Sequence, residues 1–188
     1  MRRILILAAL VLSAFEAYAY PPTVDLNAFY FTDTFNYNSA NSAYKRMMID
    51  LCVGLPLTKK GQWVLGWNYG SYTLSENPGT ETSLKITDMG PKLEYYLDKN
   101  RNWIIAATYN LISKATYTSG TSTELRGTSM KVEAGYMPEM WENVLMGAKL
   151  NWYKANFKEE ITNQTSLAQV THGRTVIYPT FAVTFRWD

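Results

Sequence analysis

Apolar and polar residues alternate with a period of two along most of this chain, and this pattern constrains the fold more than any other feature. Residues 144–153 read VLMGAKLNWY, and residues 177–187 read IYPTFAVTFRW. Similar alternation extends over residues 47–55, 88–97 and 129–136. Successive side chains of a β-strand point to opposite sides, so each segment predicts a strand with one apolar face. The chain is therefore predicted to be all-β.

Turn signals divide the chain into eight predicted strands. They cover residues 24–33, 44–57, 62–74, 84–97, 102–117, 125–136, 141–158 and 175–187. The connections after the second, fourth and sixth strands are short, whereas those near residues 35–43, 75–83, 118–124 and 159–173 are longer and polar. Short periplasmic turns and long outer loops are typical of outer-membrane barrels. We predict an eight-stranded antiparallel up-and-down transmembrane β-barrel with both ends on the short-turn side.

The first residues have the features of a signal peptide. Arg2 and Arg3 precede an apolar run over residues 4–14, and Ala17-Tyr18-Ala19 supplies the small residues of a cleavage site. The apolar run is shorter than the roughly 20 residues that a membrane-spanning helix needs. We therefore expect residues 1–19 to be removed near Ala19 on export, leaving one barrel domain over residues 20–188.

Alternation alone does not decide which face is outside, because a soluble lipocalin-like periplasmic binding barrel would bury the same apolar face. Aromatic residues at strand ends favour the membrane alternative, since amphipathic rings prefer the interface between lipid and water. Six of them are predicted to form a periplasmic girdle: Trp63, Tyr95, Trp103, Tyr136, Trp141 and Trp187. Five others are predicted to form an outer girdle: Tyr30, Trp67, Tyr69, Tyr117 and Trp152.

The polar face carries few charges for a surface that faces water, and they are of both signs. Four acidic and four basic residues are predicted to point into the lumen: Asp50, Asp88, Lys92, Glu94, Lys131, Glu133, Lys149 and Arg186. Buried charges need partners, so these residues are predicted to form a mixed-charge network that fills the lumen. An ion path or gate for small solutes is the alternative. Eight strands leave an interior only wide enough for side chains, which favours the network over a general-diffusion porin.

The C-terminal segment, YPTFAVTFRWD over residues 178–188, resembles the terminal strand of outer-membrane barrels. That strand alternates aromatic residues and ends on one, whereas here Asp188 follows Trp187. The architecture of the whole mature chain resembles the OmpA/OmpX class of small barrels. This resemblance implies an outer-membrane location, contacts with outer-membrane lipid and lipopolysaccharide, and handling by the outer-membrane assembly machinery.

Residues that could carry chemistry are few. His172 is the single histidine, and it lies near Ser166, Glu159 and Glu160 in the last predicted loop, which leaves a lipid A-modifying enzyme as an alternative. The single cysteine, Cys52, excludes an internal disulfide, and no spacing of His and Cys fits a metal site. We expect no catalytic residues, no metal, no cofactor and no nucleic-acid partner, consistent with a net charge of +2.

The remaining hypothesis is a structural or surface-interaction protein whose polar loops, with Tyr37 and His172 among their residues, contact an unidentified ligand. Two residues complicate the strand pattern. Pro91 and Pro179 lie inside predicted strands, where each lacks the N–H that the hydrogen-bond ladder requires. We expect bulges or local distortion at both positions.

Overall fold

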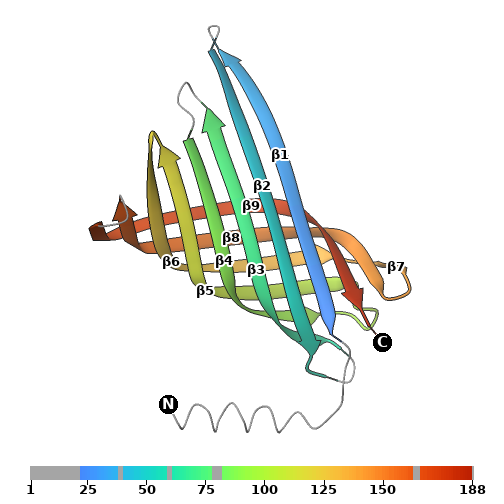
Figure 1. Cartoon of the computed structure of the whole chain (residues 1–188). Coiled ribbons are helices and arrows are strands. Elements are labelled where there is room, and N and C mark those ends of the chain that lie inside the picture. Colours follow the sequence, from blue (N-terminus) through green and yellow to red (C-terminus); the bar gives the residue numbers. More distant parts are fainter. Residues whose placement is uncertain (1–21, 38–39, 59–60, 78–81, 163–165, 188) are drawn as a thin grey trace, which may run out of the picture.

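The computed structural model describes residues 22–37, 40–58, 61–77, 82–162 and 166–187 (Figure 1). The predicted signal peptide and Asp188 lie outside this part of the chain. Within it every element is a β-strand, and hydrogen-bonded neighbours are antiparallel. No helix among the described residues has the length and apolar character needed to cross a membrane. The predicted all-β class is confirmed.

Eight long strands form a closed ring, as predicted, and a ninth strand is short. The strands are β1 (Thr23–Tyr37), β2 (Ala40–Pro56), β3 (Trp63–Asn77), β4 (Thr82–Tyr96), β5 (Trp103–Ser119), β6 (Thr121–Tyr136), β7 (Glu139–Trp141), β8 (Val144–Thr162) and β9 (Ser166–Arg186). Consecutive strands pair, except that β6 pairs with β8, and β1 pairs with β9 to close the ring. The three-residue β7 adds to the edge of β8.

The two ends of the barrel differ, although not as the sequence suggested. We call the end with residues 57–62, 97–102 and 137–143 the turn end, and the opposite end the hairpin end. Most residues expected to form long loops at the hairpin end instead extend the strands, so that only Gly120, with φ 73°, separates β5 from β6. The prediction of long loops there was wrong. Threonine-rich polar stretches such as residues 115–128 fit β-strands well, even without an apolar face.

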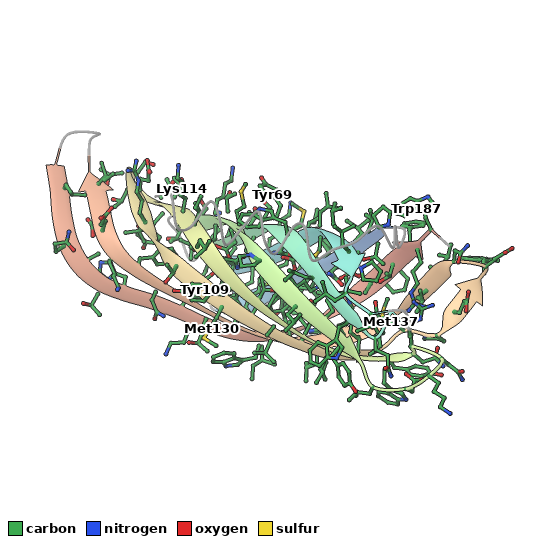
Figure 2. All side chains as sticks on the ribbon, turned by 90° about the horizontal axis from the view of Figure 1, so that it is seen from below. Tyr69, Tyr109, Lys114, Met130, Met137 and Trp187 are labelled. Atoms are coloured by element: carbon green, nitrogen blue, oxygen red, sulfur yellow. The ribbon has the colours of Figure 1, made fainter. Side chains whose placement is uncertain are left out.

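Burial settles the orientation of the two faces. Large apolar side chains point outward along every long strand, as Figure 2 shows, with 46% of Leu65, 58% of Leu150 and 54% of Phe181 exposed. The positions between them are buried and mostly polar or small. This arrangement is the reverse of a soluble barrel, and it excludes the lipocalin-like alternative.

The expected distortion is found at Pro91, whereas Pro179 lies just beyond the end of one ladder and causes no register shift in the other. The register of β4 against β5 shifts between Met89 and Lys92, which places Pro91 in a bulge. Gly90 lies so close to the backbone of Tyr109 that a Cβ atom would overlap it. At Pro179 the pairing with β8 continues through Leu150, but the pairing of β9 with β1 has already ended at Phe181.

Candidate functional site

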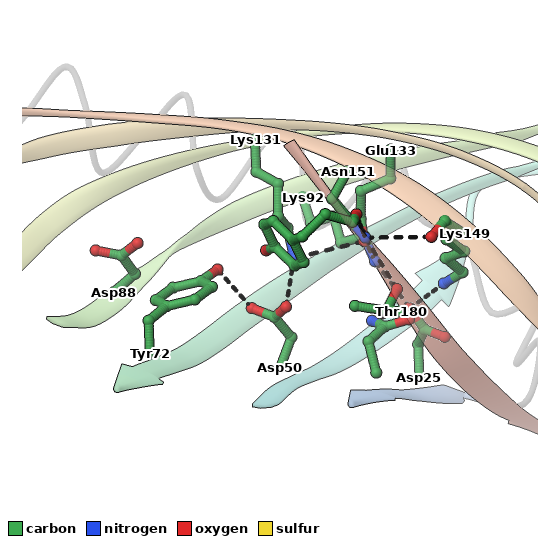
Figure 3. A network of polar contacts seen from close by, with 12 residues as sticks. Asp25, Asp50, Tyr72, Asp88, Lys92, Lys131, Glu133, Lys149, Asn151 and Thr180 are labelled. Carbon is green, nitrogen blue, oxygen red and sulfur yellow. Dashed lines mark hydrogen bonds and ion pairs between the residues drawn. The ribbon is translucent and has the colours of Figure 1, made fainter. Parts of the chain in front are cut away.

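A network of ion pairs lies across the middle of the barrel (Figure 3). The ammonium group of Lys92 is 2.8 Å from Asp25 Oδ2, 2.8 Å from Glu94 Oε1 and 2.9 Å from Glu133 Oε2. Lys149 Nζ is 2.7 Å from the same oxygen of Asp25. Because every side chain in the network is almost fully buried, its charges are screened little by solvent.

The network continues toward the hairpin end through Lys131. Its ammonium group is 2.9 Å from Asp50 Oδ2 and 3.4 Å from Glu133 Oε1. Tyr72 donates a hydrogen bond of 2.8 Å to the other oxygen of Asp50. The charged residues come from β1, β2, β4, β6 and β8, so the network ties together strands that are not neighbours. Removing one member would leave a buried charge without its partner.

The structure places the eight predicted lumen residues inside the barrel, and six of them lie in this network. The other two have different partners. Asp88 accepts hydrogen bonds from Ser129 Oγ at 2.8 Å and from Asn110 Nδ2 at 3.4 Å. Arg186 lies over the ring of Tyr96, 4.9 Å from its centroid, and donates to the carbonyl oxygen of Arg101 at 3.2 Å.

Sequence reasoning missed Asp25, the acid that joins Lys92 to Lys149. Its carboxylate also accepts hydrogen bonds from Thr184 at 2.8 Å and from Asn27 at 3.1 Å. The signal was present, because Asp25 and Asn27 alternate with the apolar residues on both sides of them. With Asp25 included, five acidic and four basic side chains are buried inside the barrel.

Apolar side chains close the interior on both sides of the network. At the turn end, a cluster contains Val64, Tyr96, Ile104, Met137, Leu145 and Ala182. Toward the hairpin end, a second cluster contains Met48, Tyr72, Leu74, Ile86, Ala115, Leu125, Tyr153, Ala155, Phe157 and Tyr178. The inward positions of β4 show the order of these layers: Ile86, Asp88, Lys92, Glu94 and Tyr96. The charged layer of the network therefore lies between the two apolar clusters.

Beyond the second cluster, the hairpin end contains an outer chamber. It has two cavities of about 380 Å³ and 260 Å³ that share Leu84, Tyr117 and Arg174 in their walls. Leu125 and Phe157 line the larger cavity, and Arg46 and Glu76 line the smaller one. An apolar wall with a few charged groups is typical of sites for small amphipathic molecules.

His172 lies on β9, opposite Phe157, rather than in a loop. It lines the larger cavity, and its Nε2 atom is 3.3 Å from Glu160 Oε2. Glu159 is opposite Gln169, and the side chain of Ser166 lies outside the described residues. Cys52 is buried and free, and the described residues include no group of His, Cys, Asp and Glu that could hold a metal ion.

Ten of the predicted girdle residues point outward but differ in depth, whereas Tyr117 points inward and lines both cavities, because the bulge between Asn110 and Ser113 reverses the faces of β5. At the turn end, the rings of Trp63 and Tyr95 are 4.4 Å apart, and those of Trp103 and Tyr136 are 4.9 Å apart. Trp141 and Trp187 are exposed at the same end. The five residues assigned to the outer girdle lie at different heights: Tyr30, Trp67, Tyr69, Tyr117 and Trp152. Trp67 is near the turn end, opposite Val53 and Pro91, whereas Tyr117 is near the hairpin end of β5.

No protein-family model matches the sequence, and no curated protein matches it. The structure is similar to Neisserial surface protein A, with a TM-score of 0.51 and 14% identity over 88% of this chain and 97% of that chain. It also matches the β domain of the Bordetella autotransporter BrkA, with a TM-score of 0.43 and 11% identity over 89% of this chain and 98% of the other. The translocator domain of the autotransporter NalP from Neisseria meningitidis matches with a TM-score of 0.44 and 6% identity, over 92% of this chain and 63% of that domain.

At sequence identities this low, the similarity shows a shared fold and nothing further about these proteins. The predicted fold, a small eight-stranded barrel of the outer-membrane type, is confirmed.

Proposed function

We propose that this protein is an integral outer-membrane barrel that does not conduct solutes, and that it acts through contacts at its hairpin end. The observation that carries the proposal is the buried ion-pair network with apolar clusters on both sides. A passage for hydrated ions would have to break these ion pairs and also hydrate two apolar layers. Both steps are costly in so narrow a barrel.

The location in a membrane is supported by the outward-facing side chains. A soluble protein rarely exposes so continuous an apolar surface, whereas lipid requires one. An up-and-down barrel with both ends on the turn side fits an exported chain whose turn end lies in the periplasm. The hairpin end would then face outward, where outer-membrane lipid and lipopolysaccharide are its nearest partners. We expect assembly machinery that reads the last strand, β9, to insert the chain.

We also propose that the barrel is not an enzyme. His172 and Glu160 form a pair in the chamber wall, but His172 is exposed and the pair alone supplies no nucleophile. The contact surface is the chamber and the strand extensions around it, rather than the long loops that the sequence suggested.

Conductance across a planar lipid bilayer tests the proposal. The purified protein should give no stepwise current at either polarity, while a general-diffusion porin inserted under the same conditions serves as the positive control. Insertion is verified independently by heat-modifiable migration of protein recovered from the same bilayer lipids. Reproducible current steps from the inserted protein would overturn the proposal in favour of the small-solute or ion channel.

A further inference from the structure

One seam of the barrel is only partly closed. β1 pairs with β9 from Thr23, opposite Arg186, to Ala28, opposite Phe181. The other edge of β1 pairs with β2 along its whole length, and the other edge of β9 pairs with β8 as far as Ser166. Beyond Ala28 and Phe181 the two strands diverge, as Figure 1 shows. Both strands therefore present a free edge in the hairpin half of the barrel.

Pro179 accounts for the point at which this ladder ends. The N–H groups of an antiparallel strand point alternately to its two neighbours. Arg186 donates its N–H to the carbonyl oxygen of Asn143, on the β8 side, so the odd-numbered residues of this stretch face β1. After Phe181, the next residue that would donate to β1 is Pro179, which has no N–H. The sequence itself thus removes the next hydrogen bond of the seam.

The seam opens within the apolar outer surface. Tyr30 and Ile177, the outward residues beside the opening, are 61% and 65% exposed. Phe31 continues the inward series of Asp25, Asn27 and Phe29, yet 45% of it is exposed. The ring of Phe31 is thus accessible to solvent in the stretch of β1 that no longer pairs with β9.

The outer chamber lies next to this opening. Arg174 on β9 contributes to both of its cavities, and the Nε atom of Arg174 is buried without a hydrogen-bond partner. A buried guanidinium N–H without an acceptor is costly, so an anionic group at this position would be stabilised. The apolar residues Leu84, Leu125 and Phe157 line the wall around it.

We propose that the open seam is a lateral entrance through which a lipid with a phosphate headgroup places an acyl chain in the outer chamber. The chain contacts the apolar wall, and the phosphate accepts hydrogen bonds from Arg174. A strand from another protein could pair with one free edge, but the edges diverge, so it could not pair with both. The proposal rests on the proposed function only in placing the barrel in a membrane.

Disulfide trapping tests the opening. In a Cys52→Ala background, Leu26→Cys with Val183→Cys joins positions that face each other in the closed part of the seam. Thr32→Cys with Ile177→Cys joins positions that would face each other if the same register continued. The first pair should oxidise readily and the second should not. Adding Pro179→Val restores the missing N–H and should let the second pair oxidise. Equal oxidation of both pairs with Pro179 in place would overturn the entrance.

Lipid binding tests the occupant. Native mass spectrometry with phosphatidylglycerol should detect bound lipid, and Arg174→Gln should weaken that binding roughly tenfold, because a charge-assisted hydrogen bond is lost. The matched control is Arg126→Gln, since Arg126 is exposed and pairs with Glu124 at 2.7 Å. Oxidising the Pro179→Val, Thr32→Cys, Ile177→Cys variant before lipid is added should abolish binding, and reduction should restore it.

Equal lipid binding by the oxidised and reduced forms, or a dimer in place of a lipid adduct, would overturn the proposal. These outcomes are independent of conductance. A barrel that is silent in planar bilayers but binds no lipid would refute the entrance and leave the proposed function intact. A conducting barrel would refute the proposed function alone.

Discussion

The turn-end half and the hairpin-end half of this barrel differ in how completely their strands pair around the ring. Toward the turn end, all strands pair around the ring, and Lys92 lies among three carboxylates. Toward the hairpin end, β1 and β9 separate, and Arg174 of β9 lines both cavities of the outer chamber. The closed ring and most of the buried ion pairs therefore lie toward the turn end, whereas the partly open seam and the cavities lie toward the hairpin end.

The largest effect should come from removing the central cation of the network. Lys92→Met leaves Asp25, Glu94 and Glu133 without the ammonium group that they share. We expect it to lower the free energy of unfolding by about 3–5 kcal/mol, as for other broken buried ion pairs. Urea unfolding of the protein reconstituted in lipid vesicles measures this quantity.

The control for this variant is Arg126→Met, which removes the cation of an exposed pair at the hairpin end. The side chains of Arg126 and Glu124 are 46% and 41% exposed, so the loss should be below about 1 kcal/mol. Equal losses for the two variants would show that the network is no more important than a surface ion pair, and the distinction between the halves would fail.

A smaller contrast is expected from two glycines on neighbouring strands. A Cβ atom on Gly147 in β8 would overlap the backbone of Tyr136, so Gly147→Ala should cost about 1–3 kcal/mol. A Cβ atom on Gly173 in β9 would lie 3.4 Å from the nearest atom, so Gly173→Ala should change stability by less than about 0.5 kcal/mol. The same unfolding measurement compares them, and a costly Gly173→Ala would indicate that β9 at Gly173 is as tightly packed as β8 at Gly147.

Most of the fold could be predicted from the sequence, because a period of two determines which side of the sheet each residue faces once the strands are known. The inward position of Lys131, for example, follows from its place between Met130 and Val132. The ion-pair partners could not be predicted in this way, because Lys149 and Asp25 are far apart in the sequence and meet only in the folded barrel. The alternation of apolar and polar residues does not indicate which strands lie close together, so it could not predict this ion pair.

The hairpin end was predicted less well for a related reason. Residues 159–173 have no apolar face, and polarity alone was read as a loop, although these residues mostly extend β8 and β9. Pro179 was recognised as a residue that cannot donate to a ladder. Which neighbour loses that hydrogen bond depends on the register, and only the pairing of Arg186 with Asn143 shows that it is β1.

Amide hydrogen exchange, measured residue by residue by NMR in lipid nanodiscs, tests the difference between the two halves most directly. The amides of Leu26 and Ala28, which face β9 in the closed part of the seam, should exchange slowly. Those of Tyr30 and Thr32, which face the opening, should exchange quickly, while the intervening Phe31 amide, paired with β2, stays protected. Uniform protection from residue 26 to residue 32 would show a seam that is closed throughout and would contradict this account.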